Sequence, residues 1–254
     1  MFEFTKEQEM LRAMVREFAE KELAPRALDI DKKGEFPADL FKKIAGLGLL
    51  GISTPKELGG SEMGHLAATI ATEEVARVYP SAAFFLEVGT GPLYALANFG
   101  SADQKKKYIP PVISGAKRMC IAATEPSGGS DLTTMQTEAV AAGDSYVING
   151  RKVYITSGGA SDYCLLLAKT GERASFFVVE KGTPGFIVGR RQDQMGLKGV
   201  DVSELVFTDC KVPKDAVIGK EGAGFPIAIT TFTVARPSIG ALGLGIARGA
   251  FDIA

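Results

Sequence analysis

The hydrophobic pattern of the sequence changes at Pro110-Pro111, and this change divides the chain into regions of different structure. Before it, apolar residues recur at the three- and four-residue spacing typical of helices, as in Leu11, Met14, Val15 and Phe18. After it come short segments rich in β-branched and aromatic residues, at 119–123, 136–141, 146–155, 163–168 and 175–179. From Gly222 the helical pattern returns and runs to Ala254. We therefore expect an α+β protein whose helices and strands form separate domains.

The expected domains are an N-terminal all-helical domain at residues 1–115, a middle β domain at 116–221 and the start of a C-terminal helical bundle at 222–254. No helical pattern interrupts the strands of the middle domain, so we expect an antiparallel barrel or sandwich. Strands and helices do not alternate, and no Gly-x-Gly-x-x-Gly opens a helix, which disfavours a doubly wound dinucleotide-binding fold.

Turn and helix-breaking residues predict where elements end. Thr5-Lys6-Glu7-Gln8 has the form of a capping box, and Pro25 is expected to limit the helix that it opens. Further helices are expected at 67–78, at 81–99 and at 102–108, the last stopping at Pro110-Pro111. Gly143-Asp144 and Asn149-Gly150 indicate turns, and Pro237 should kink or divide the last helix.

The last helix has a wide apolar face, and the sequence stops inside its pattern without a capping residue. A helix of this kind needs another element to cover it. We expect either that the sequence is incomplete or that this helix pairs with another chain.

Composition excludes several classes of function. A formal net charge of −1 gives no electrostatic basis for binding nucleic acid or a membrane surface, and no apolar run is judged long enough to span a membrane. The N-terminus has neither a signal-type nor an Arg-rich targeting pattern. Cys120, Cys164 and Cys210 lie far apart in apolar surroundings, which predicts buried reduced thiols and a cytoplasmic location. A single histidine, His65, indicates neither a metal site nor a Ser-His-Asp apparatus.

Two segments of the middle region are candidates for ligand binding. Residues 120–131 run from a short apolar strand into a loop rich in Gly, Ser and Pro. Backbone N–H groups in such a loop lack regular partners and can receive an anion or the polar edge of a ring. Residues 147–159 follow as a second strand-like segment. Taken alone, either segment is equally well explained as an ordinary strand-to-loop junction.

Together these segments resemble the flavin-binding signature of the acyl-CoA dehydrogenase family. The resemblance covers the whole chain and rests chiefly on Thr124-Glu125-Pro126, Gly129-Ser130-Asp131, Tyr154-Ile155-Thr156 and the segment 207–213. Supporting matches are 99–108, 195–199 and Ala235-Arg236-Pro237. The resemblance implies the order of domains given above, with most of the C-terminal helical domain absent from this sequence.

The resemblance also implies FAD, lying against the β domain and facing a cavity between the β and helical domains. It assigns to the cofactor Ile121, Ala122, Ala123, Thr124, Gly129, Ser130, Tyr154, Ile155 and Thr156. It assigns to acyl-CoA the residues Glu87, Thr90, Ser130, Phe232 and Arg236. Without the resemblance, a strand Tyr or Thr would be assigned to core or cross-strand packing.

The chemistry implied by the resemblance needs a carboxylate to take the α-proton of the thioester while the β-hydrogen passes as hydride to the flavin. Most family members carry this Glu in a segment absent here, and a minority carry it where this sequence has Ala235, which cannot act as a base. Thr233 also replaces a common Asp. Glu87 aligns with a pocket-lining Glu of medium-chain members, and burial would raise its pKa. We expect it to bind a polar or cyclic acyl group or to act as an unconventional base, against the alternative of an ordinary surface Glu.

The function expected from the resemblance is FAD-dependent dehydrogenation of an acyl-CoA, with electrons passing to an electron-transfer flavoprotein. Family members imply a homo-oligomer, either a tetramer or a dimer. Two alternatives remain open. One is a flavin oxidase or monooxygenase on the same fold, which differs mainly in oxygen access. The other is a catalytically silent flavin- or CoA-binding subunit whose partner supplies the base.

Overall fold

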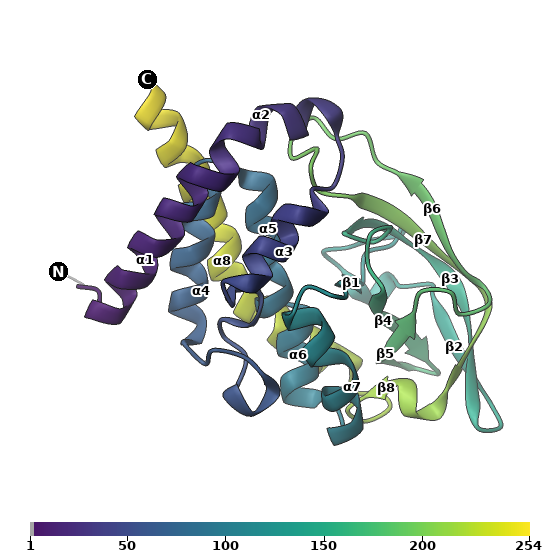
Figure 1. Ribbon diagram of the computed structural model, residues 1–254. Helices are drawn as coiled ribbons and strands as arrows, with labels where there is room; N and C mark the ends of the chain where they lie inside the picture. The colour runs from purple at the N-terminus through teal and green to yellow at the C-terminus, as the bar shows by residue number, and fades with distance from the viewer. Residues whose placement is uncertain (1–2) are drawn as a thin grey trace.

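The computed structural model describes residues 3–254 and places the helices on one side of the molecule and the strands on the other (Figure 1). The polar–apolar periodicity of residues 3–113 produces seven α-helices, and the 30 residues Gly224–Ile253 form one more. The helices are α1 Lys6–Phe18, α2 Ala24–Lys33, α3 Ala38–Gly46, α4 Gly64–Ala76, α5 Pro80–Thr90, α6 Pro92–Phe99, α7 Ala102–Ile113 and α8 Gly224–Ile253.

The start of α1 confirms the predicted capping box, because the Thr5 hydroxyl accepts from the Gln8 N–H while the Gln8 side chain accepts from the Thr5 N–H. Pro25 limits the first helix less sharply than expected. A five-residue π turn, Ala19–Leu23, joins α1 to α2, and Pro25 lies in the first turn of α2. Its missing N–H costs little at that position, so the chain stays helical.

Two expected helix boundaries were wrong. The helix expected at 81–99 is two helices, separated at Gly91 (φ −101°, ψ −98°), with Pro92 opening α6. Helix α7 continues through Pro110 and Pro111 to Ile113, so neither proline stops it. Helix α8 is not divided at Pro237 and runs unbroken for 30 residues.

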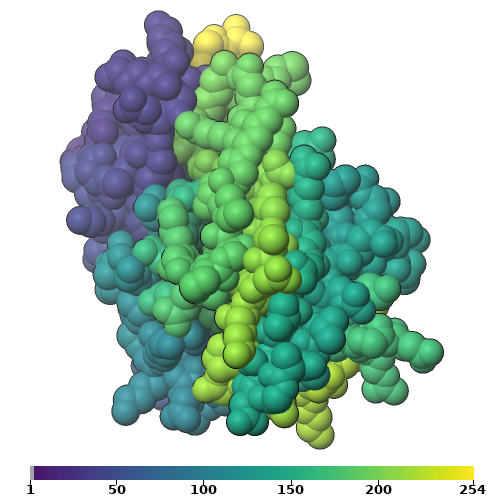
Figure 2. All heavy atoms as spheres, turned by 90° about the vertical axis from the view of Figure 1, so that its right-hand side faces the viewer, coloured from purple at the N-terminus to yellow at the C-terminus, as the bar shows by residue number. Residues whose placement is uncertain are grey.

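The strands form one eight-stranded sheet in the order β6-β7-β3-β2-β4-β5-β8, with β1 paired to β4. Their bounds are β1 Met119–Ala122, β2 Glu138–Ala142, β3 Ser145–Thr156, β4 Tyr163–Thr170, β5 Arg173–Glu180, β6 Phe186–Arg191, β7 Val202–Pro213 and β8 Val217–Ile218. Most pairings are antiparallel, as expected, but β1 and β2 both pair with β4 in parallel. Figure 2 shows the sheet face on which β7 lies between β6 and β3.

Only one of the two predicted turns exists. Gly143 has φ +60° and lies in the tight connection between β2 and β3. Asn149-Gly150 instead lies inside β3, where the pairing with β7 shifts register. A Cβ at Gly150 would lie 2.4 Å from the Thr137 hydroxyl oxygen, so this glycine allows close approach within the sheet.

The core has two parts, separated by the sheet. The first lies between the helices and the strand residues that face them. The second is formed only by residues of the strand region and lies on the other side of β4 and β5. Strand β1 contributes to both, since Met119 and Ile121 pack with the helical core while Cys120 and Ala122 belong to the second core. The three cysteines are buried and free, as the sequence predicted.

Helix α8 (yellow in Figure 1) packs along α4 and α5 and reaches β4 and β5 at its N-terminal end. Its length and apolar composition meet the criteria for a membrane-spanning helix, which corrects the expectation that no run in the sequence is long enough. In this fold Ile227, Ala241 and Leu242 are buried. One face of α8 packs against α4 and β5, while Ile229, Leu244 and Phe251 on the remaining surface are exposed.

Candidate active site

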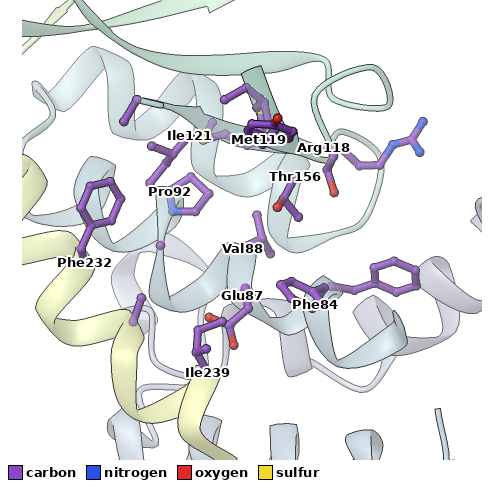
Figure 3. Close-up of a pocket in the computed structure, with 18 of the residues that line it drawn as sticks. Phe84, Glu87, Val88, Pro92, Arg118, Met119, Ile121, Thr156, Phe232 and Ile239 are labelled. Atoms are coloured by element: carbon purple, nitrogen blue, oxygen red, sulfur yellow. The ribbon is translucent and has the colours of Figure 1, made fainter. Parts of the chain in front are cut away.

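A cavity of about 270 Å³ lies where β1 and the end of β3 face helices α5, α6 and α8 (Figure 3). The sheet side of the cavity is lined by Ile121, Ala123, Thr124, Tyr154, Ile155 and Thr156. The helical side is lined mainly by apolar groups: Phe84, Val88, Pro92, Phe232, Ala235 and Ile239, with Glu87 among them. The cavity therefore brings together segments more than 140 residues apart in the sequence.

Strand β1 reaches the cavity as an open edge of the sheet. It pairs with β4 along one side, and beyond its end the Val153 N–H donates to the Thr124 carbonyl at 3.0 Å. Within residues 3–254, no protein group accepts a hydrogen bond from the backbone N–H or the hydroxyl of Thr124. Because half-buried polar groups normally have a hydrogen-bond partner, these two unpaired groups are available to a ligand.

Tyr154 lies on the rim of the cavity in an unusual conformation. Its φ is +57°, which is rare for a residue with a large side chain, and the pairing of β3 with β7 is irregular between Lys152 and Ile155. The side chain is 66% exposed although it belongs to a central strand. The bulge therefore turns an aromatic ring away from the core and toward the cavity mouth.

Glu87 is the carboxylate of the cavity among the described residues. Its Oε2 accepts from the Thr90 hydroxyl at 3.0 Å, while its Oε1 is buried and has no hydrogen-bond partner. Figure 3 shows it between Val88 and Ile239. Burial in these apolar surroundings raises the pKa of Glu87 to about 7, against the smaller, opposing effect of the Thr90 hydrogen bond. Near neutral pH this group can hold or release a proton.

The structure brings together most of the predicted site residues, but not all. Ala122 faces the second core, and Thr90 is buried beneath Glu87. Arg236 is exposed and its guanidinium donates to the Thr233 hydroxyl at 3.1 Å, outside the cavity lining. The loop residues Gly129 and Ser130 also lie outside the lining. A Cβ at Gly129 would lie 2.9 Å from Thr124 Cγ2, so this glycine fits closely against the lining residue.

Sequence reasoning missed Phe36, Phe41 and Arg118, which line the cavity together with Phe85. Phe36, Phe41 and Phe85 pack with ring centroids 4.9–5.7 Å apart, and all three line the cavity. The guanidinium of Arg118 lies 4.4 Å from the centre of the Phe36 ring, and burial lowers its pKa. Phe36 lies in the connection before α3, where no local pattern indicates a role.

These features define a class of site. Apolar walls, an exposed aromatic ring on the rim and unpaired backbone donors at a strand end fit a flat aromatic cofactor with one polar edge. The space left beside α5 and α8 suits an apolar acyl group. The residues present therefore fit a flavin ring.

Comparison with known proteins identifies the family. The model of the N-terminal domain of acyl-CoA dehydrogenases matches residues 5–116, and the model of their middle domain matches residues 120–210. The chain belongs to the acyl-CoA dehydrogenase family. Curated relatives include the short-chain-specific acyl-CoA dehydrogenase of Clostridium acetobutylicum, which is 42% identical over 99% of this chain and 68% of its own length. The acryloyl-CoA reductase (NADH) of Anaerotignum propionicum is 40% identical over 99% of this chain and 66% of its own length.

Solved structures similar to this chain agree with the family assignment. The butyryl-CoA dehydrogenase of Megasphaera elsdenii has a TM-score of 0.94 at 34% identity, covering 98% of this chain and 68% of that one. A chain from the structural study of the electron transferring flavoprotein of Acidaminococcus fermentans has a TM-score of 0.95 at 38% identity, covering 98% and 67%. The chain thus spans about two thirds of the length of these relatives.

Proposed function

We propose that this protein is an FAD-dependent acyl-CoA dehydrogenase that introduces a double bond between the α- and β-carbons of an acyl thioester. The observation that carries this proposal is the cavity, in a chain of this family, whose sheet side fits a flavin ring and whose helical side is apolar. When bound, FAD accepts the hydride that leaves the β-carbon.

Residues on the sheet side would hold the cofactor. The unpaired N–H and hydroxyl of Thr124 are donors for the polar edge of the ring, and Thr156 adds a hydroxyl at the end of β3. Tyr154 would flank the ring from the rim, and Ile121 would pack against its face. Gly129 and Ser130 belong to the loop that follows, and we propose that they contact the phosphate-bearing part of the cofactor or substrate.

Residues on the helical side would hold the acyl group and exclude water. Val88, Phe232 and Ile239 supply apolar surface, and water exclusion strengthens the electrostatic interactions of the reacting groups. Arg236 lies on the exposed face of α8, so we propose for it a contact with the CoA portion rather than with the acyl chain.

The α-proton needs a base, and Ala235, which lines the cavity, cannot supply one. Among the described residues that line the cavity, Glu87 is the carboxylate with a pKa near 7. We propose that Glu87 contacts the acyl group, either as a hydrogen-bonding group for a polar or cyclic substituent or as the base itself. Glu87→Gln tests the second role. Full-length enzyme carrying this change loses turnover at least about 100-fold if Glu87 is the base, and unchanged turnover removes that role.

The test of the main proposal is anaerobic titration of the purified full-length protein with acyl-CoA. Yellow protein whose flavin absorbance bleaches on addition of butyryl-CoA supports the dehydrogenase. Flavin that stays oxidised with every acyl-CoA supports instead a silent binding subunit, a second candidate that Ala235 favours. Protein that binds no FAD contradicts both. Rapid reoxidation of bleached protein by oxygen would indicate an oxidase.

We further propose the partners and location that the family suggests. Electrons would pass to an electron-transfer flavoprotein, and the protein would form a dimer or tetramer. The three buried free thiols support a reducing compartment such as the cytoplasm. Analytical ultracentrifugation and reduction of an electron-transfer flavoprotein by the acyl-CoA-treated enzyme test the first two points.

A further inference from the structure

A buried ion pair lies directly behind the sheet side of the cavity. Lys152, on β3, is completely buried, and its ammonium donates to Glu125 Oε1 at 2.7 Å and to the Ala123 carbonyl at 3.1 Å. Burying an ammonium group costs several kcal/mol unless it is paired and hydrogen-bonded. Because removing this ammonium from water is so unfavourable, its presence here calls for a functional explanation beyond packing.

The carboxylate of the pair is held rigidly. Glu125 is 4% exposed, and it accepts from the backbone N–H groups of Thr137 at 3.0 Å and Gln136 at 2.5 Å. Burial opposes its ionisation, but the bonds from Lys152, Thr137 and Gln136 outweigh burial and lower the pKa of Glu125. Desolvation in turn lowers the pKa of Lys152, opposed by the bond to Glu125. The pair thus connects β3, the end of β1 and the start of β2.

The ion pair acts directly on the peptide group between Ala123 and Thr124, because the Lys152 ammonium donates to the carbonyl of that peptide. Its carbonyl accepts from the ammonium, and its N–H belongs to Thr124 and has no acceptor within residues 3–254. In a planar trans peptide the N–H points opposite to the C=O, so it points away from Lys152. The next carbonyl, of Thr124, is fixed by the Val153 N–H. The peptide is therefore immobilised with its donor free at the cavity.

We propose that Lys152 is a positioning residue that fixes and polarises the Ala123–Thr124 peptide, making the Thr124 N–H a strong donor to the polar edge of the bound flavin and raising the flavin's reduction potential. This inference rests on the proposed function. An ammonium bound to an amide carbonyl strengthens the hydrogen bond that the same amide donates, and low local polarity increases the effect. A stronger hydrogen bond to the polar edge of the ring in turn favours the form of the ring that has gained electrons.

The test compares Lys152→Met with the double variant Lys152→Met/Glu125→Gln, because the single change leaves a buried carboxylate unpaired. The double variant keeps the amide oxygen at position 125 as an acceptor for the N–H groups of Thr137 and Gln136. We expect it to bind reduced FAD at least about tenfold more weakly relative to oxidised FAD than the wild type does. For a two-electron couple this ratio lowers the midpoint potential by about 30 mV.

Two further variants separate tuning from loss of structure. Lys152→Arg keeps the charge and a donor, and it should keep the wild-type potential. Lys211→Met removes an exposed lysine from β7 outside the cavity lining, and it should leave the potential unchanged. In the absence of flavin, the amide proton resonance of Thr124 should shift upfield in the double variant, which reports the weaker polarisation directly.

The outcomes are distinguishable. A folded double variant with an unchanged potential and an unchanged Thr124 resonance overturns the inference. A double variant that fails to fold also counts against it, because the pair would then be required by the fold and not separable as a tuning device. Wild-type protein that binds no FAD contradicts the proposed function instead, while the apo-protein resonance still tests the polarisation of the peptide.

Discussion

The hydroxyl of Thr90 donates to Oε2 of Glu87 at 3.0 Å, one turn further along α5, while Oε1 of the same carboxylate is buried without a partner. A half-satisfied carboxylate between apolar side chains prefers the neutral form. This relationship makes Glu87 a group whose protonation depends on pH within the physiological range, and it leads to two measurable consequences.

The first consequence concerns stability. The pKa of Glu87 is about 7 in the folded protein against an ordinary value of 4.5. Below pH 4.5 the group is neutral in both folded and unfolded chains and has no pH-dependent effect. As pH rises from 4.5 through 7, the unfolded chain ionises first, so stability is lost, by at most about 3 kcal/mol. We expect Glu87→Gln to remove this loss, measured as the difference in unfolding free energy between pH 5 and pH 8 in urea.

The matched control for this prediction is Glu57→Gln, which changes an exposed carboxylate. It should keep the wild-type dependence on pH. The same pH dependence in Glu87→Gln and in the wild type would show that Glu87 ionises normally in the folded protein.

The second consequence concerns Thr90 itself. Its hydrogen bond favours the ionised carboxylate, so Thr90→Val should raise the pKa of Glu87 above about 7. The loss of stability should be about 1.5–3 kcal/mol at pH 8, where the accepting group is charged, and smaller at pH 5. A double-mutant cycle with Glu87→Gln measures the coupling. A coupling energy that is equal at both pH values would contradict the assignment.

The arrangement of elements was largely predictable because it follows from local periodicity. Helical spacing before residue 113 and short β-branched segments afterwards predicted which regions form helices and which form strands, and the capping box at Thr5 was recognisable from four letters. Predicted boundaries of strands and helices were wrong where the same residues are compatible with two local structures. Asn149-Gly150 is a good turn sequence, yet the same glycine allows Thr137 to approach within a continuous strand. Proline usually ends a helix, because it lacks the N–H that would donate to the carbonyl four residues back and its ring crowds that carbonyl, yet α7 continues through Pro110 and Pro111 to Ile113.

The candidate site was predictable only as far as the family signature reaches. Thr124, Tyr154 and Thr156 were placed by resemblance, and they line the cavity. Nothing local indicated that Lys152, in a strand between Arg151 and Val153, would be fully buried or would bind Glu125, 27 residues away. Such a pairing depends on how β1, β3 and the intervening loop pack together, which a single sequence does not display. The position of Arg236 outside the cavity lining was unpredictable for a similar reason, since its orientation depends on how α8 rotates against α4.

A second buried carboxylate should respond to pH in the opposite sense from Glu87. Glu74 on α4 is 1% exposed and accepts from Arg12 at 3.0 Å, from Arg16 at 2.8 Å and from Arg248 at 3.2 Å. Burial opposes its ionisation, but these arginines prevail and lower the pKa of Glu74 to about 2. Its contribution to stability is therefore present above pH 4.5 and lost as pH falls toward 2.

We expect Glu74→Gln to destabilise the protein by about 3 kcal/mol at pH 7, because it leaves arginines of α1 and α8 without their shared partner. The variant should also lose less stability than the wild type between pH 5 and pH 3, measured by urea unfolding. Glu17→Gln is the control, since Glu17 forms an exposed pair with Lys21 and should change stability by less than about 0.5 kcal/mol. Equal losses in the two variants would contradict a structural role for the Glu74 cluster.

The close contact between α8 and the end of α4 depends on two glycines of α8. Gly240 and Gly243, on the same helix, make no such contact. A Cβ at Gly245 would lie 2.4 Å from the Glu73 carbonyl oxygen, and a Cβ at Gly249 would lie 2.1 Å from that of Arg77. A Cβ at Gly243 meets no atom within 4 Å.

Gly245→Ala should therefore destabilise the protein by about 1–3 kcal/mol by forcing the two backbones apart. Gly243→Ala should stabilise it by about 0.5–1 kcal/mol, because alanine favours the helix. Thermal and urea unfolding of the two variants measure the difference, and a stabilising Gly245→Ala would show that α8 packs against α4 less closely than this structure describes.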